Sequence, residues 1–458
     1  MFLQAKIWAF FQNIGTLTLL LLALPFNAIV VLPCLLWSWI AKLFQKKVVA
    51  ANPKNILITG GKMTKALQLA RCFYAAGHTV FLVETHKYWL SGHRFSRVVK
   101  GFFTVPAPEK DANGYCQGLL DIVKQEKIDV FIPVSSPVAS YYDSIAKSLL
   151  SPHCEALTFD AEITEMLDNK FTFCQKAREL GLTAPKAFLI TDPEQVLNFD
   201  FTADGSQYII KSIAYNSVYR LDMTKLPMSS KEQMASFVKG LPISESQPWI
   251  MQEFISGQEY CTHSTVRNGI VRLHCCSQSS PFQVNYEQVD NQEIFQWVQQ
   301  FVKALNLTGQ ISLDVIQTKD GKVYPVECNP RTHTAITMFY NHPGVADAYI
   351  LDSKEDCSAR TLRDREPPIQ PLPESKPTYW TYHELWRLTG IRSWGQLKGW
   401  FNKIIKGTDG IFQVNDPLPF LMVHHWQIPL LLLNNMRKFK GWVKIDFNIG
   451  KLVELGGD

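Results

Sequence analysis

Two carboxylates and an amide near residue 320 have the spacing of a magnesium site. A two-residue turn at Asp320-Gly321 would pair the apolar runs on either side of it and place Asp314 directly opposite Glu327. Asn329 would share their face, because side chains on one face of a strand recur every second residue. Facing carboxylates repel each other unless a cation lies between them, and oxygen ligands suit Mg²⁺, with Mn²⁺ as an alternative. A solvated acidic edge is the competing interpretation, and the apolar character of both runs disfavours it.

A second turn signal, Asn268-Gly269, predicts another hairpin. Its register would place His263 opposite His274, with Glu259 on the same face. Two histidines do not make a metal site. We expect these residues to line a pocket.

The segment before these hairpins has the pattern of a Rossmann-like domain. Residues 55–61 form an apolar run that ends in Gly60-Gly61, and a helical pattern over 62–76 and a second apolar run over 79–83 follow. This order is typical of a βαβ unit. The G-x-G-x-x-G fingerprint of a dinucleotide site is absent, which argues against an NAD-dependent oxidoreductase.

Further along, the apolar runs predict a strand over 128–134, a helix over 163–180, and strands over 208–211 and 249–255. The fold class is therefore α/β. We expect five segments: an apolar N-terminal segment (1–50), a Rossmann-like domain (53–160), a domain that carries the hairpins (161–350), a Pro-rich linker (351–378) and a Trp-rich C-terminal extension (379–458). The extension could form an interfacial platform or a small domain that covers the body, and we favour the second.

The N-terminal segment is apolar enough to bind a membrane. No charged residue lies between Lys6 and Lys42, and further lysines follow. The positive-inside rule then places the rest of the chain on the cytoplasmic face, anchored through residues 7–41. Pro25 and Pro33 allow a kinked span or a re-entrant hairpin. A cleaved signal peptide and a buried helix of the soluble body are the alternatives.

Composition excludes several classes of protein. The 458 residues carry 46 Lys and Arg against 41 Asp and Glu, a net charge of +5, which gives no case for a nucleic-acid partner. Ten cysteines occur without a C-x-x-C pair, so neither a zinc ribbon nor a disulfide framework is expected. A reducing compartment fits this usage best.

The order of these motifs resembles the ATP-grasp superfamily. The specific part is Asp314 followed by Glu327-Cys328-Asn329-Pro330-Arg331, with the G-x-E of residues 257–259 before it and two lysines further upstream. The resemblance spans roughly residues 53–349. It implies an ATP-grasp fold behind a Rossmann-like domain, and an ATP-dependent ligase as the activity.

The resemblance also implies roles for individual residues. They comprise ATP phosphate contacts (Lys170, Lys211), an adenine hinge (Glu253, Phe254, Ile255), a ribose contact (Glu259), Mg²⁺ ligands (Asp314, Glu327, Asn329), and catalytic cations (Arg331, Lys211). One departure concerns the segment 212–220, where many relatives have a glycine-rich phosphate loop and this chain has no glycine. The hydroxyls of Tyr215, Ser217 or Tyr219, or the charge of Arg220, could substitute.

Longer segments are similar to the mycosporine-glycine synthase family of ATP-grasp ligases. They are residues 58–69 (ITGGKMTKALQL), 83–93, 261–276 and the end from Asp416. This resemblance implies that ATP activates 4-deoxygadusol, a cyclohexenone with an enolic oxygen, and that the amine of glycine displaces the phosphate. Candidates for the base that accepts the amine proton are His263, His274 and His333. Candidates for binding glycine's carboxylate are Arg267, Arg272 and Arg220, and the sequence does not choose among them. Alternatives are a ligase for another acid and amine, and a non-catalytic membrane-tethered nucleotide-binding protein.

Overall fold

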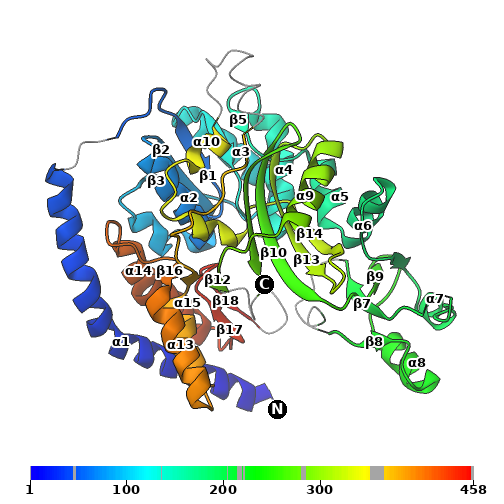
Figure 1. Ribbon diagram of the computed structural model, residues 1–458. Helices are drawn as coiled ribbons and strands as arrows, with labels where there is room; N and C mark the ends of the chain where they lie inside the picture. The colour runs from blue at the N-terminus through cyan, green and yellow to red at the C-terminus, as the bar shows by residue number, and fades with distance from the viewer. Residues whose placement is uncertain are drawn as a thin grey trace.

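The computed structural model describes residues 2–44, 48–135, 137–203, 205–213, 219, 222–279, 285–350 and 366–454. A parallel sheet, two antiparallel four-stranded sheets and a C-terminal group of helices make up the body, and one long N-terminal helix lies along its outside (Figure 1). The sheet that contains β10 and β13 lies between the parallel sheet and the sheet that contains β7 and β9 (Figure 1).

The first part of the body is Rossmann-like, as expected. Its parallel sheet has the strand order β3-β2-β1-β4-β5. Its elements are β1 (Asn55–Ile58), α2 (Thr64–Ala75), β2 (Thr79–Thr85), η1 (His86–Tyr88), η2 (Gly92–Phe95), β3 (Val99–Val105), α3 (Ala112–Gln125), β4 (Val130–Ile132), α4 (Pro137–Leu150) and β5 (Glu155–Ala156). The strand order reverses between β1 and β4, where ligands bind in open α/β sheets.

The second part contains two antiparallel sheets with separate apolar cores. The first sheet, β6-β9-β7-β8, is built from β6 (Ala187–Ile190), α7 (Pro193–Leu197), β7 (Tyr208–Ser212), β8 (Lys225–Leu226), α8 (Lys231–Lys239) and β9 (Trp249–Glu253). The second, β11-β10-β13-β14, is built from β10 (Gln258–Arg267), β11 (Ile270–Gln278), α9 (Gln292–Ala304), β13 (Gly309–Gln317) and β14 (Val323–Asn329), and it is followed by η4 (Thr334–Phe339) and α10 (Val345–Tyr349).

The single helix expected over 163–180 is two helices, α5 (Ala161–Asp168) and α6 (Lys170–Glu179). Asn169 between them has an extended backbone, and its side-chain oxygen accepts a hydrogen bond from the N–H of Phe171 at 2.9 Å. Asn is a favoured N-cap residue because its side chain satisfies an N–H that has no partner within the helix. The break places Lys170 at the first position of a new helix.

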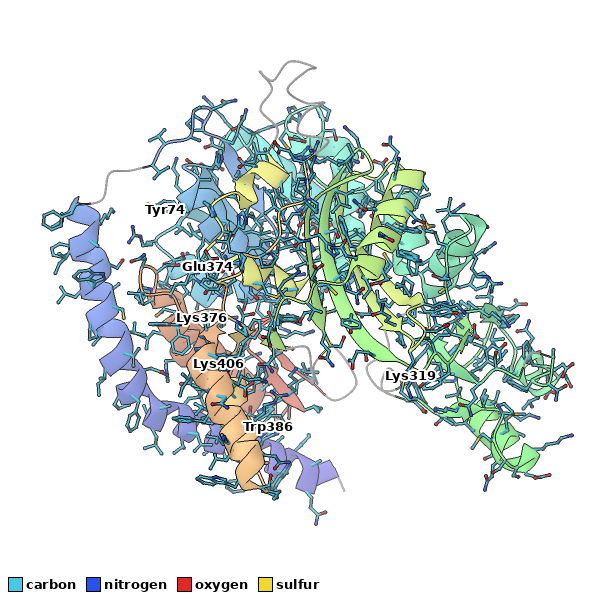
Figure 2. The ribbon with its side chains drawn as sticks, viewed as in Figure 1. Tyr74, Lys319, Glu374, Lys376, Trp386 and Lys406 are labelled. Carbon is cyan, nitrogen blue, oxygen red and sulfur yellow. The ribbon has the colours of Figure 1, made fainter. Side chains whose placement is uncertain are left out.

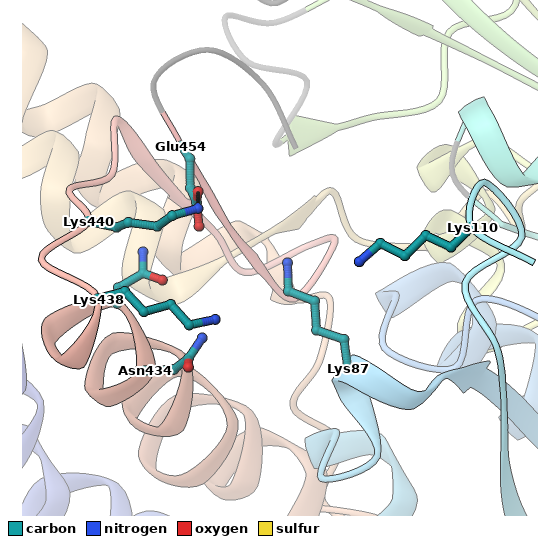
Figure 3. A pocket seen from close by; sticks show the side chains of 7 residues that line it. Lys87, Lys110, Asn434, Lys438, Lys440 and Glu454 are labelled. Carbon is teal, nitrogen blue, oxygen red and sulfur yellow. Dashed lines mark hydrogen bonds and ion pairs between the residues drawn. The ribbon is translucent and has the colours of Figure 1, made fainter.

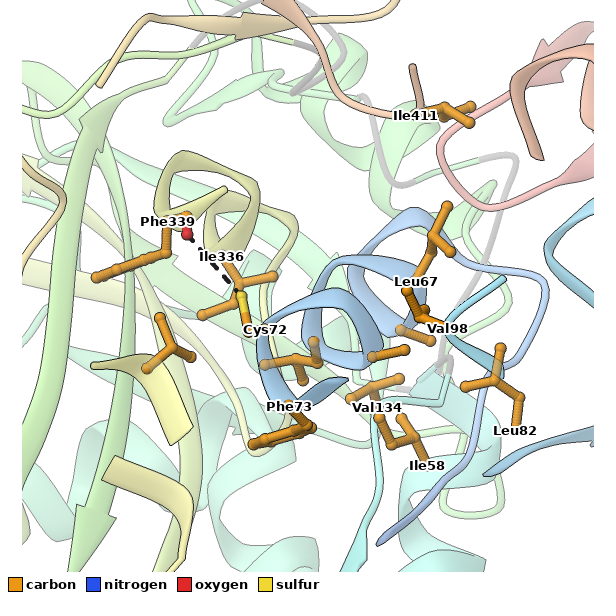
Figure 4. Packing of buried hydrophobic residues seen from close by; sticks show 14 of the residues in the cluster. Ile58, Leu67, Cys72, Phe73, Leu82, Val98, Val134, Ile336, Phe339 and Ile411 are labelled. Carbon is orange, nitrogen blue, oxygen red and sulfur yellow. Dashed lines mark hydrogen bonds between the residues drawn. The ribbon is translucent and has the colours of Figure 1, made fainter. Parts of the chain in front are cut away.

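The C-terminal extension packs against the Rossmann-like part. Its elements, with the short strand β12 (Asn285–Tyr286) that pairs with it, are β15 (Thr378–Tyr379), α12 (Thr381–Leu388), α13 (Trp394–Lys406), β16 (Thr408–Asp409), α14 (Leu418–Met422), the π-helical η5 (Val423–Gln427), α15 (Ile428–Arg437), β17 (Lys444–Asp446) and β18 (Lys451–Val453). Leu67 of α2, Ile336 of η4 and Ile411 of the extension belong to one buried cluster (Figure 4). Arg71 of α2 also forms a buried ion pair with Asp416 at 2.9 Å.

Helix α1 (Phe2–Phe44) bends around the outside of the extension (Figure 1). Pro25 and Pro33 lie inside it, and proline is the usual cause of such a bend. One narrow stripe of the helix is buried against the body, including Asn13, Val31 and Ser38. Two polar members of that stripe bond to the extension, with the Asn13 amide donating to the Lys440 carbonyl at 2.9 Å and the Ser38 hydroxyl to the Asn415 carbonyl at 2.8 Å.

Candidate active site

The centre of the candidate site is the pair of carboxylates on β13 and β14. Asp314 pairs with Glu327 in the antiparallel register, which confirms the predicted juxtaposition. Asn329 pairs with Ser312 two positions further along, so it shares their face. Three oxygen-bearing side chains therefore project to one side of the sheet.

The turn that sets this register differs from the expectation. Gln317 pairs with Val323, and the N–H of Thr318 donates to the Lys322 carbonyl at 3.0 Å, so the loop holds three residues rather than two. A register shift between Asp314 and Val315 then restores the alignment. A β-bulge changes pairing by one residue in this way, and here it compensates for the longer loop.

Burial and like charge make the pair dependent on a cation. Burial, Glu327 and Glu259 raise the pKa of Asp314 to about 7, against the opposing influence of Lys170 and Arg331. A divalent cation would reverse this shift by favouring the ionised carboxylates. Within the described part of the chain, no group of three or more His, Cys, Asp or Glu side chains could hold a metal alone. Two carboxylates with an amide oxygen nevertheless fit Mg²⁺, which completes its ligands with water and nucleotide phosphates.

Two of the predicted cations lie against these ligands. Lys170, at the start of α6, has its Nζ 3.4 Å from Oε1 of Glu327. Arg331 donates from Nη1 to Asp168 at 3.0 Å and from Nη2 to the side-chain oxygen of Asn329. The structure thus brings Lys170 and Arg331 together with the Asp314 face.

Lys211 lies on the other antiparallel sheet, on β7. Its Nζ donates to the Asp222 carbonyl at 2.5 Å and contacts the sulfur of Met223 at 3.0 Å. These contacts direct the ammonium toward the segment that follows the expected phosphate loop. Arg220, with Tyr215 and Ser217 of that loop, lies outside the described residues.

The expected adenine hinge joins the two antiparallel sheets. The Glu253 carboxylate accepts from the Lys186 N–H at 3.0 Å, and the Phe254 N–H donates to the Gln207 carbonyl at 2.7 Å. The Glu253 carboxylate and the Phe254 N–H therefore both have hydrogen-bond partners within the protein. Among the described residues, no hydrogen bond involves the N–H of Ile255, so this donor could serve a ligand. Gly257 follows, and a Cβ there would lie 2.2 Å from the Gln317 carbonyl oxygen, so only glycine allows this approach.

The predicted pairing of His263 with His274 is wrong. A register shift between Thr265 and Val266 places His263 opposite Cys275 and Ser264 opposite His274. The two histidines consequently project from opposite faces of the sheet. His274 bonds to the Ser264 hydroxyl at 2.9 Å, and burial lowers its pKa to about 4. Glu259 shares the face of His263, as expected, because no shift separates them on β10.

His263 and His333 lie together beside the carboxylate face. The N–H of His333 approaches Nδ1 of His263 at 3.4 Å. Burial lowers the pKa of both imidazoles, that of His333 to about 3, and the charge of Lys65 lowers them further. Both are therefore neutral near pH 7.

The Arg267 side chain forms hydrogen bonds within the protein that hold two parts of the fold together. Its guanidinium bonds to Glu155 of β5 and to the carbonyl of Tyr349, and the residue is buried. These bonds fasten β10 to the Rossmann-like sheet. The substrate role suggested for Arg267 is therefore not supported by its position.

Two lysines missed by the sequence analysis lie buried at the start of α2. Lys65 donates from Nζ to the Thr332 carbonyl at 2.6 Å, next to Arg331. Burial, followed by the charge of Arg331, lowers its pKa well below the ordinary lysine value. Lys62 pairs with Glu84 at 3.1 Å. The signal in the sequence was a pair of lysines directly after a glycine turn, at the edge of the sheet where ligands bind.

Comparison with known proteins gives the class of this fold. Residues 167–335 match the family model described as an ATP-grasp domain. The chain is similar in structure to an N5-carboxyaminoimidazole ribonucleotide synthetase in complex with ADP, with 14% identity, a TM-score of 0.51, and coverage of 76% of this chain and 87% of that chain. The N5-carboxyaminoimidazole synthetase of Staphylococcus aureus, complexed with ADP, gives 13% identity, a TM-score of 0.50, and coverage of 73% and 82%. No curated protein matches the sequence.

The chain has the ATP-grasp fold. The matched range contains Lys170, the hinge and the whole Asp314 face. The domain match and the shared fold agree on an ATP-grasp domain in this part of the chain.

We expect Asp314→Ala and Glu327→Ala each to abolish ATP turnover, because either change removes a charged oxygen ligand for Mg²⁺. The measurement is ADP release at saturating Mg·ATP, with circular dichroism to establish that each variant is folded. Asp320→Ala is the matched control, since Asp320 is an exposed carboxylate in the turn of the same hairpin. Full turnover in either site variant would contradict the assignment.

Proposed function

We propose that the protein is an ATP-grasp ligase that phosphorylates an acidic oxygen and then joins the activated carbon to an amine. The observation that carries this proposal is the Asp314–Glu327 pair, with Lys170 and Arg331 beside it. A nucleotide-binding protein without turnover would not need a half-buried, mutually repelling pair of carboxylates. Their presence argues against the non-catalytic alternative.

Each of the site residues would have its own part in this chemistry. Bound Mg²⁺ would neutralise phosphate charge and orient the β- and γ-phosphates. Lys170 would contact the phosphates, and Arg331 would stabilise charge on the transferring group. The N–H of Ile255 would donate to the adenine edge, and the carboxylate of Glu259 would accept from the ribose hydroxyls. Lys211 would contact the phosphates from the other sheet after leaving the Asp222 carbonyl.

For the substrates, we propose 4-deoxygadusol and glycine. The support is the resemblance of four segments, including residues 58–69, which carry Lys62 and Lys65. The enol oxygen of this ketone belongs to a vinylogous acid, so its phosphorylation by ATP releases ADP and creates a leaving group. The amine of glycine then forms a bond to the ring carbon, and the C–O bond to phosphate breaks. Another acid and amine remain the alternative within the same reaction class.

The attacking amine must lose a proton, and Lys65 is the best-placed base. Its Nζ is buried beside the loop that carries Arg331, and its lowered pKa favours the neutral amine form. His263 and His333 are the other neutral bases of this region. A buried lysine whose pKa is lowered accepts a proton near neutral pH more readily than an ordinary surface lysine does.

The substrates are tested by ADP release from the full-length protein in detergent, with Mg·ATP, 4-deoxygadusol and glycine each omitted in turn. We expect release to require the ketone, and a new ultraviolet-absorbing adduct to require glycine as well. ATP binding without release would retain the ATP-grasp assignment and overturn the substrates.

For Lys65, we expect Lys65→Met to reduce kcat by about a hundredfold or more, a typical contribution of a general base. Because the base acts when neutral, wild-type kcat should rise with pH through the pKa of Lys65, and the variant should lose this dependence. Lys65→Arg keeps the positive charge but cannot accept a proton, so it should fail equally. Activity of the arginine variant would show that only the charge matters.

We also propose that α1 attaches the protein to a membrane without crossing it. It is the one helix of the described chain long and apolar enough to span, over Gln4–Phe44. A span needs about 20 consecutive residues surrounded by lipid. Asn13, Leu20, Val31 and Ser38 are each at most 5% exposed against the body, so no such stretch is free of protein contact. The outer face carries exposed apolar residues from Trp8 to Phe44, which suits a helix lying in the interface.

Attachment without crossing places both ends of α1 on one side of the membrane. In a Cys34→Ser background, we expect Lys6→Cys and Lys42→Cys both to react with a membrane-impermeant maleimide when the protein is added to preformed vesicles. Both positions are exposed in the structure. If one of the two cysteines reacted with the maleimide only after detergent was added, α1 would instead cross the membrane.

A further inference from the structure

A hollow of about 270 Å³ lies between the Rossmann-like part and the C-terminal extension. It is lined by Lys87 of η1, Lys110 of the loop before α3, and Lys438 and Lys440 of the turn after α15, with Asn434 and Glu454 beside them (Figure 3). Asn435 also lines it. We call this set the lysine pocket. Three segments distant in sequence thus direct ammonium groups into one space.

The positive charge of the lysine pocket is mostly uncompensated. Lys440 pairs with Glu454 at 2.8 Å. Among the described residues, Lys87, Lys110 and Lys438 make no ion pair. Burial lowers the pKa of Lys87, the charge of Glu454 opposes this shift, and nearby lysines, including Lys440 and Lys438, add to it. Like charges that converge in this way are costly unless an anion joins them.

Asn435 provides a second, independent sign of a ligand. The residue is 4% exposed, and its side-chain Nδ2 has no hydrogen-bond partner within the described structure. A buried donor without a partner costs free energy, so such groups usually meet a partner or a ligand. Asn435 lines the lysine pocket, so this unpartnered amide lies in the pocket wall beside the ammonium groups.

We propose that the lysine pocket binds a phosphate group. Ammonium groups arriving from several directions, with an amide N–H, match the distributed oxygens of a tetrahedral phosphate. A planar carboxylate is better matched by the fork of an arginine, and the pocket contains none.

The contacts between the lysine pocket and α1 suggest which molecule carries the bound phosphate group. The Lys440 carbonyl accepts a hydrogen bond from Asn13 of α1, and Phe439 stacks on Phe10 with ring centroids 6.2 Å apart. The pocket wall is thus joined to the first turns of the helix that we propose to lie in the membrane interface. A phospholipid headgroup would be within reach there, and a free phosphate anion is the other source of the same chemistry.

The test compares Lys110→Gln/Lys438→Gln with Lys303→Gln/Lys319→Gln in the full-length protein. The control pair removes the same charge from exposed sites on α9 and the β13–β14 turn, and Figure 2 shows Lys319 on the ATP-grasp side of the molecule. Binding is measured by flotation with vesicles of phosphatidylcholine, or of equal parts phosphatidylcholine and phosphatidylglycerol. Calorimetric titration with inorganic phosphate in detergent forms the second arm.

A lipid source predicts that the pocket variant loses affinity for the phosphatidylglycerol vesicles by about tenfold or more, while the control and the binding to phosphatidylcholine are unchanged. A free-phosphate source predicts that wild type and control bind phosphate and the pocket variant does not. Equal losses in both variants, or no loss in either arm, would overturn the proposal. Thermal unfolding of each variant establishes that it is folded.

Discussion

Two like charges held face to face, Asp314 and Glu327, are the constraint around which the site is built. Both side chains lie on a hairpin whose other residues are largely apolar, and the register of its strands holds the two carboxylates opposite each other. Neighbouring groups offset the repulsion. Lys170 reaches Glu327 because Asn169 starts a new helix there, and Arg331 is fixed by Asp168 and Asn329. The helix break at Asn169, the bulge beside Asp314 and the loop that carries Arg331 thus all help to hold the two carboxylates together against their repulsion.

Local patterns in the sequence predict which residues face each other across neighbouring strands, provided that no bulge shifts the register. Asp314 was correctly placed opposite Glu327, although the loop is longer than expected and a bulge compensates for it. His263 and His274 were misplaced by one residue, since nothing in their composition marks the bulge at Thr265. The βαβ order follows from apolar periodicity, whereas the ATP-grasp fold was implied by the resemblance of the motifs to that superfamily. The contact of Lys65 with Thr332 joins residues far apart in the chain, and no local pattern encodes it.

Helix α2 connects the site to the C-terminal extension. Its first turn presents Lys65 to the loop that carries Arg331, and further along Arg71 is held by Asp416. Breaking a buried ion pair on one side is strongly destabilising, because it leaves an uncompensated charge. The extension therefore stabilises the element that carries the proposed base, which gives a physical reason for its presence beside the ligase body.

The docking of α1 also constrains how the chain can be made. Gln12 donates to the Trp442 carbonyl at 2.8 Å, a contact between residues 430 positions apart. Helix α1 therefore leaves the ribosome long before the segment against which it packs. Until that segment emerges, the polar groups of the stripe have no partners and the apolar face has no protein to cover it. Contacts of such long sequence separation form slowly. A lipid surface or a chaperone that shelters α1 during translation would thus determine how much of the protein reaches the folded state.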